Sequence, residues 1–174
     1  SGDGSMHKNG FTLIELIVVV SILGILSITA LPRFLDISNE ALVTKLNSMK
    51  NNLESATYRV YAKALLAEKI TGTQTITVDG DVITINSGYP IGNWDGTVRH
   101  ILNFSHIGNS ANNCPYDWCG RGNARTLPGG LTSSNGRGVK VTPFGYNHTD
   151  LCGVNYMNHY DGTFPQIEAL TSEC

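Results

Sequence analysis

Glu15 is the first residue whose surroundings demand a chemical explanation. It is the only charged residue in the 21-residue run from Phe11 to Leu31, which is otherwise composed of apolar and small polar side chains. A carboxylate deep in hydrocarbon costs at least a few kcal/mol unless it has a partner. The position of Glu15 therefore predicts either a cationic partner for its carboxylate or a place near the water interface.

The four cysteines, Cys114, Cys119, Cys152 and Cys174, are the second group of reactive residues, and all lie in the second half of the chain. An even number of cysteines in a loop-rich region is typical of disulfides and of an oxidising compartment. A bridge between Cys152 and Cys174 would tie the C-terminal tail to a strand, and one between Cys114 and Cys119 would close a tight loop. Four cysteines allow three pairings, so this local pairing is a hypothesis.

Zinc is the alternative use for these cysteines. Two of them could bind the metal together with histidines, since the C-x4-C spacing falls within the loose range of zinc sites. No pair of histidines with the usual spacing follows the cysteines, so we favour disulfides and expect neither a metal nor another cofactor. The candidate histidines are His100, His106, His148 and His159.

The first part of the chain is predicted to be one very long helix. The run 11–31 would span about 30 Å as a helix, which is the thickness of a bilayer's hydrocarbon. Pro32 follows and removes a helical hydrogen bond. Beyond it, apolar residues recur at spacings of seven, four and three as far as about Ile70, with charged residues on the other face. We therefore expect an apolar helix over 11–32 and an amphipathic helix over 33–70.

The rest of the chain, residues 71–174, reads as β-sheet with long loops. Two alternating runs flank Asp79-Gly80, which is a strong hairpin signal. Residues 97–104 fit a short helix or a strand, and the Gly-, Asn- and Ser-rich residues 105–135 are expected to form a long connection. The further strand candidates are 138–142 and 152–157. The predicted fold class is α+β.

Composition and motifs exclude several functions. The formal net charge is −2, and residues beyond 71 contain five Lys or Arg against eight Asp or Glu, so nucleic acid is not expected as the main partner. The alternative is a local basic patch formed by Arg121, Arg125, Arg137 and Lys140. No hydrolase, zinc-protease, P-loop or dinucleotide-binding motif is present, so we expect no enzymatic activity.

The stretch KNG-FTLIEL resembles the class III signal of type IV prepilins. It combines a short basic leader, Gly10, Phe11, a glutamate five residues after the junction, and a long apolar helix. The resemblance implies that residues 6–10 are a leader, cut between Gly10 and Phe11 by a prepilin peptidase, and that Phe11 is N-methylated. Residues 1–5 read as an expression remnant. Residues 11–32 would then form the membrane and filament-core helix, able to lose helicity between Gly24 and Pro32.

The resemblance also gives Glu15 a role in assembly. Cleavage would create an α-amine on Phe11, and a carboxylate four residues later can pair with that amine when both are removed from water. The alternative is a glutamate near the helix N-terminus that lies at the headgroup level and is favoured by the helix dipole.

The family implies a structural function. The expected fold is a long helix packed on an antiparallel sheet, with residues 33–174 as a globular domain and disulfide-bonded C-terminal loops. Subunits would wait in the bacterial inner membrane, interact with the pilus assembly machinery, and polymerise with copies of themselves into an extracellular filament. That filament would serve surface adhesion, biofilm formation and motility.

Two short stretches are most similar to mannose-sensitive haemagglutinin pilins, SGYP at 87–90 and the segment 151–174. The CPYDWC loop departs from that subgroup. The alternatives are a type II secretion pseudopilin, which commonly uses calcium in place of disulfides, and a minor pilin or DNA-uptake subunit.

Overall fold

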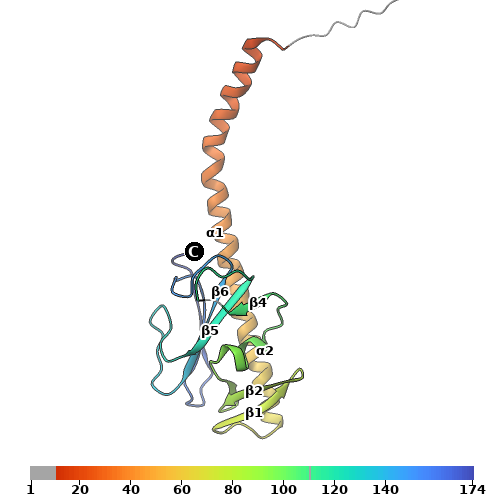
Figure 1. Ribbon diagram of the computed structural model, residues 1–174, viewed down its shortest axis with the longest axis vertical. Helices are drawn as coiled ribbons and strands as arrows, with labels where there is room; N and C mark the ends of the chain where they lie inside the picture. Colours follow the sequence, from red (N-terminus) through yellow and green to blue (C-terminus); the bar gives the residue numbers. More distant parts are fainter. Residues whose placement is uncertain (1–10, 110) are drawn as a thin grey trace, which may run out of the picture. The chain divides into compact units, whose positions relative to one another are not determined.

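The long helix α1 dominates the first part of the fold. The computed structural model describes residues 11–109 and 111–174, and for residues 27–38 it describes the backbone but not the side chains. The chain divides into two compact units, unit 1 (Ser1–Ala41) and unit 2 (Leu42–Cys174). α1 comprises Leu13–Leu66 (Figure 1). It ends before residue 70, where we expected its end, because Glu68 adopts a positive φ of 56° that no helix can continue.

A small three-stranded sheet follows α1 in unit 2. Its strands are β1 (Thr73–Val78), β2 (Asp81–Asn86) and β3 (Tyr89–Pro90), all antiparallel in the order β1-β2-β3. Asp79 and Gly80 both have positive φ, 53° and 97°, as a type I′ turn requires. The hairpin predicted from the Asp-Gly pair is therefore confirmed.

A second, five-stranded sheet forms the larger part of unit 2. Its order is β4-β5-β6-β7-β8, and each neighbouring pair is antiparallel except β4 and β5, which are parallel. The strands are β4 (Ile107–Asn109), β5 (Trp118–Ala124), β6 (Arg137–Pro143), β7 (Gly153–Asn158) and β8 (Gln166–Leu170). The expected antiparallel pairing is present, but it is divided between two sheets, and β4 and β5 form the one parallel pair among the described strands.

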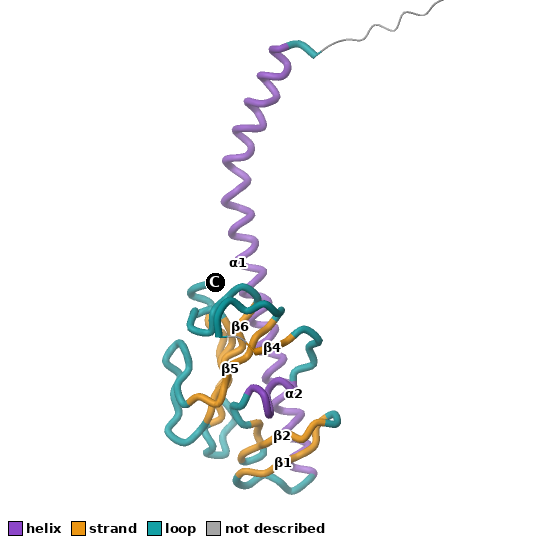
Figure 2. The backbone as a smooth tube through the Cα atoms, viewed as in Figure 1, coloured by secondary structure: helices purple, strands orange, loops and turns teal. Residues whose placement is uncertain are grey.

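The segments between the two sheets also differ from the expectation. The predicted connection 105–135 contains β4 and β5, and β8 was not predicted at all. Residues 97–104 form neither a clear strand nor a full helix: a π-helical turn, η1 (Trp94–Val98), leads into the single turn α2 (Arg99–Ile101). Figure 2 shows the short strands in orange joined by extensive teal loops.

The core of unit 2 forms where the apolar stripe of α1 meets the two sheets. Leu46, Met49 and Leu53 belong to one buried cluster with residues of the five-stranded sheet and η1. Further along α1, Val60 and Ala64 belong to a second cluster with residues of β1 and β2. All five of these α1 residues are at most 1% exposed. The heptad-like stripe predicted from sequence is therefore the buried face of α1 within unit 2.

Two buried side chains of β7 link the two sheets. The Tyr156 hydroxyl donates to the Pro90 carbonyl at 2.6 Å, and the Asn158 side-chain amide donates to the Pro90 and Tyr89 carbonyls at 3.0 and 3.3 Å. Both side chains are at most 1% exposed. Because buried carbonyls need partners, these bonds fix β3 against β7.

Candidate functional site

Thr12 and Glu15 form a capping box at the start of α1. The Glu15 carboxylate accepts hydrogen bonds from the Thr12 backbone N–H at 2.9 Å and from the Thr12 hydroxyl at 2.8 Å. The Glu15 N–H donates in return to Thr12 Oγ1 at 3.4 Å, and Thr12 O accepts the first helical bond from Leu16. This reciprocal T-x-x-E arrangement satisfies backbone donors that a helix N-terminus otherwise leaves unpaired.

Thr12 is thus a partner of Glu15 that was not predicted from the sequence. The signal was present, because a threonine three residues before a glutamate at the start of an apolar run is a capping-box pattern. The structure places Glu15 in the first turn of α1, as the dipole interpretation requires. The predicted partner of Glu15, an amine on Phe11, exists only after cleavage, so that role stays a prediction.

An apolar surface surrounds Glu15. The large apolar side chains between Phe11 and Leu26 are 46–82% exposed, on every side of the helix. In unit 2, by contrast, the apolar stripe of α1 is buried. An exposed apolar surface of this extent needs another apolar phase or another molecule to cover it. Among the described residues, no helix combines the length and apolarity that crossing a membrane would require.

The remaining N-terminal predictions fall partly outside the described residues. Gly10, half of the predicted cleavage junction, lies there, and so does the side chain of Pro32. The backbone at Pro32 is helical. At Gly24, a Cβ would meet no atom within 4 Å, so packing in this chain does not require glycine there. The proposed flexibility between Gly24 and Pro32 stays a prediction.

The cysteines form two local disulfides, Cys114–Cys119 and Cys152–Cys174, with sequence separations of 5 and 22. This is the pairing favoured from sequence. Cys152 is fully buried in the cluster that contains Leu46, Met49 and Leu53, and Cys174 packs against that cluster. Because no cysteine is free, none can supply the thiolate of the zinc site considered above.

Lys140 is fully buried on β6, although its neighbours in sequence suggested a surface patch. Its ammonium group donates to the His148 carbonyl at 2.7 Å and to the Asp150 carbonyl. Burial lowers the pKa of Lys140 to about 8, against the opposing effect of the Asp150 and Glu173 carboxylates. The basic patch is therefore smaller than its four residues indicated, because Lys140 faces loop carbonyls and not solvent.

His148 lies in the loop between β6 and β7, which contributes the carbonyls that Lys140 binds, and it is half-buried. Its pKa is lowered to about 4, chiefly by burial and in smaller part by the positive charges of Lys140 and Arg121. Its Nδ1 atom is buried and has no hydrogen-bond partner among the described residues. His148 is consequently neutral at pH 7, next to the buried ammonium group of Lys140.

Comparisons with known proteins concern the N-terminal part of the chain. A family model described as the prokaryotic N-terminal methylation motif matches residues 5–31. The chain is similar to the type IV narrow pilus major component PilA5 of Thermus thermophilus, with 53% identity over 36 residues. That match covers 21% of this chain and 31% of the relative, so the chain matches less than a third of the relative's length. No solved structure gives a significant match. The segment around Phe11, Thr12 and Glu15 thus falls within a recognised methylation motif.

Proposed function

We propose that this chain is a structural subunit of a type IV pilus. The observation that carries the proposal is the methylation motif over residues 5–31, which includes Phe11 and Glu15. The likeness to a pilus major component supports it, as does the exposed apolar surface of α1 from Phe11 to Leu26. A filament whose subunits bury this surface against one another would remove it from water.

In this proposal, maturation precedes assembly. A prepilin peptidase removes the leader 6–10 by cutting between Gly10 and Phe11, and the new amine of Phe11 is methylated. The helix 11–32 holds the subunit in the inner membrane until the assembly machinery transfers it into the extracellular filament. Residues 33–174 form the globular domain, with a type IV pilin fold in which the second half of α1 packs on the sheets.

Glu15 would gain a second partner during this sequence. In the structure its carboxylate is held by Thr12, three residues earlier on the same helix. Cleavage adds a cationic amine one residue before Thr12. When neighbouring helices cover α1, an unpaired carboxylate would be costly, and the amine of the same or a neighbouring subunit would neutralise it. The capping box then keeps the carboxylate at the helix N-terminus, where that amine lies.

We further propose that the filament resembles mannose-sensitive haemagglutinin pili and serves adhesion, biofilm formation and motility. The support is the resemblance of residues 87–90 and 151–174. In the structure, Ser87 and Gly88 form the turn into β3 with positive φ values of 52° and 84°, and Pro90 accepts the Tyr156 bond that links the sheets. These segments thus include the contact that joins the two sheets of unit 2.

The proposal is tested by deleting the gene and examining the cells by electron microscopy. Loss of all fibres, restored by the wild-type gene, is the expected result for a major subunit, and unchanged fibres would contradict it. Mass spectrometry of the assembled protein should find an N-terminus at Phe11 that carries one methyl group.

Complementation with variants tests the role of Glu15. Glu15→Ala should reach the membrane fraction in wild-type amounts while fibres become scarce. The matched control is Glu54→Ala, which removes another α1 glutamate, one whose only described ion pair is with Lys50 at 3.8 Å. Normal fibres with Glu15→Ala would refute the assembly role of the carboxylate without affecting the structural proposal.

A further inference from the structure

The end of α1 exposes apolar side chains and borders a hollow in unit 2. Leu66, the last residue of α1, is 87% exposed, and Leu65 and Ile70 are also exposed. The hollow has a volume of about 360 Å³ and lies between the end of α1 and the edge strand β1. Its lining residues are Lys63, Leu66, Ala67, Lys69, Ile76 and Thr77. The charged residues of this lining are thus both lysines.

Contacts within the subunit hold the walls of the hollow in place. The Lys63 ammonium group donates to the Asp79 carboxylate at 3.1 Å, and the Lys69 ammonium group donates to the Thr75 carbonyl at 2.7 Å. Ile76 belongs to the buried cluster that joins β1 to α1. Because an ammonium group has three donors, both lysines can bind a further acceptor. The hollow is therefore preformed and has a cationic rim.

An exposed aromatic side chain lies in the loop that follows β6. Phe144 is 63% exposed and precedes Gly145, whose φ of 83° belongs to a tight turn. The Phe144 N–H donates to the Asp117 carbonyl at 3.2 Å, and the Gly145 N–H donates to the Cys114 carbonyl at 2.9 Å. The Cys114–Cys119 disulfide holds this second segment. The backbone of the Phe144 turn is therefore fixed, although the ring itself meets solvent.

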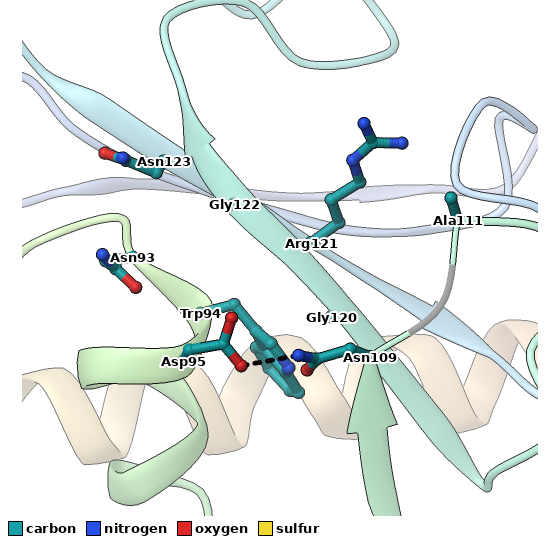
Figure 3. A pocket seen from close by; sticks show the side chains of 9 residues that line it. All are labelled: Asn93, Trp94, Asp95, Asn109, Ala111, Gly120, Arg121, Gly122 and Asn123. Atoms are coloured by element: carbon teal, nitrogen blue, oxygen red, sulfur yellow. Dashed lines mark hydrogen bonds between the residues drawn. The ribbon is translucent and has the colours of Figure 1, made fainter.

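The strand β5, which begins directly after Asp117, gives the Phe144 turn a rigid support. The Trp94 ring of η1 lies so close to β5 that a Cβ on Gly120 would fall 1.9 Å from it, and only glycine permits this approach. Figure 3 shows Trp94 beside β5, together with the hydrogen bond of 2.6 Å from the Asn109 side-chain amide to the Asp95 carboxylate. That bond joins β4 to η1 on the same side of the strand.

The Phe144 turn and the hollow lie far apart within one subunit. Pro143, next to Phe144, pairs with Trp118 in the β5–β6 register, and the Lys45 ammonium group lies 5.0 Å from the centroid of the Trp118 ring. Leu66 follows Lys45 by about 20 residues on α1, which corresponds to about 30 Å along the helix. The Phe144 ring therefore cannot reach the hollow of its own subunit, but it can reach that of a copy displaced along α1.

The two surfaces are complementary in charge. The Asp117 carboxylate, beside the Phe144 turn, is exposed and lies 3.7 Å from His106 Nδ1. The hollow presents the ammonium groups of Lys63 and Lys69. Opposite charges around a contact fix its orientation, and an aromatic ring in a desolvated pocket is a typical anchor of a protein interface.

We propose that Phe144 of one subunit inserts into the hollow of another copy of this chain, where Asp117 pairs with the two lysines. The inference rests on the proposed pilus function, which supplies the second copy. It deepens that function by naming a contact between globular domains, separate from the apolar helix. Because the contact joins two different surfaces, each end of a growing assembly keeps one of them free, and further subunits can add along the fibre.

Photo-crosslinking in intact fibres tests this contact. With p-benzoylphenylalanine in place of Phe144, the sheared fibres are irradiated and the cross-linked peptides are identified by mass spectrometry. The expected cross-link joins position 144 to residues 63–77, and the separation of about 30 Å within a subunit assigns it to two copies. The matched control places the same amino acid at Tyr58, which is 61% exposed on α1 but outside the hollow. It should give no cross-link to residues 63–77.

Substitutions test the energetic weight of the contact. Phe144→Ala fibres should release subunits into mild detergent at least about tenfold faster than wild-type fibres, because loss of an aromatic anchor acts mainly on dissociation. Asp117→Lys should also speed release, and Lys63→Glu in the same chain should reverse that effect by restoring the opposite charge. The unassembled Phe144→Ala and Asp117→Lys variants should unfold in urea as the wild type does, since both side chains are exposed.

Three results would overturn the proposal. These are cross-links from position 144 that lead elsewhere, such as to residues 11–26 of a neighbouring helix, wild-type rates of release from Phe144→Ala fibres, and failure of Lys63→Glu to reverse the effect of Asp117→Lys. Fibres that form from this chain without a contact at residues 63–77 would refute this inference alone. Absence of any fibre that contains the chain would refute the pilus proposal as well.

Discussion

Replacing Lys140 with methionine should change how the stability of unit 2 depends on pH. In the folded chain the pKa of Lys140 is lowered to about 8 from its ordinary value of 10.5, chiefly because the side chain is fully buried. Between these two pH values the unfolded chain keeps the proton that the folded chain has lost. The free energy of unfolding should therefore rise with pH across this range, by about 3 kcal/mol in total.

The Lys140→Met variant isolates this contribution. Methionine fills a similar volume but has no titratable group. The free energy of unfolding of the wild type minus that of the variant should therefore increase by about 3 kcal/mol from pH 7.5 to 10.5. Burial raises the pKa of Tyr156, and its titration lowers stability at the alkaline end. That effect is common to both proteins and cancels in the difference. The free energy of unfolding at pH 7 also differs between the two proteins, because in Lys140→Met the His148 and Asp150 carbonyls lose their hydrogen-bond donor.

The assay is urea unfolding of the full chain in detergent, followed by tryptophan fluorescence at a series of pH values. Trp94 and Trp118 are both buried in unit 2, so the signal reports on that unit. Lys69→Met is the matched control, because the Lys69 ammonium also donates to a backbone carbonyl, that of Thr75 at 2.7 Å, but does so at the surface. If the free energies of unfolding of wild type and Lys140→Met changed in parallel with pH, the interpretation of Lys140 as a destabilising buried charge would be refuted.

Three further predictions concern the stability of unit 2. Replacing Cys152 and Cys174 with serine should lower the free energy of unfolding by about 3 kcal/mol, and replacing Cys114 and Cys119 should lower it by about 2 kcal/mol. The first loss is larger because loop-closure entropy grows with loop length, and the sequence separations are 22 and 5. Equal losses in urea unfolding would contradict this entropic account. Asn158→Ala should lower the free energy of unfolding by about 1–3 kcal/mol, because the Tyr89 carbonyl loses its side-chain donor and the Pro90 carbonyl keeps only the Tyr156 hydroxyl, while exposed Asn135→Ala should have no measurable effect. Since the pKa of His148 is lowered to about 4, the unfolded chain binds its proton first as pH falls from 6.5. The free energy of unfolding should then fall by about 3 kcal/mol towards pH 4, and a wild-type loss persisting in His148→Gln would exclude this cause.

Local signals allowed part of this fold to be predicted from sequence. The Asp79-Gly80 pair specified its turn because the positive φ values it favours match the twist of the hairpin. The apolar stripe of α1 was visible because a helix that buries one face has apolar residues at the helical period. That period can be recognised in the sequence without knowing what the face packs against.

The remaining features depend on contacts between residues distant in sequence. β5 contains Gly120 because the Trp94 ring lies against it, and glycines in a strand hide the alternation by which strands are recognised. Lys140 alternates with valines and so resembled a solvent-facing strand position, but the loop that contributes the His148 and Asp150 carbonyls covers that face. The Thr12–Glu15 capping box is the exception, since its pattern was local and could have been recognised.

The Cys152–Cys174 disulfide also limits how far the chain can be stretched. It encloses β7 and β8 in a covalent loop with a separation of 22 residues. Tension between α1 and the C-terminus would pass through the two sulfur atoms and bypass this loop, so about 75 Å of contour length could not be extended. Under load, β7 and β8 could be pulled away from β6, but they could not be drawn out into a linear chain until the bond is reduced.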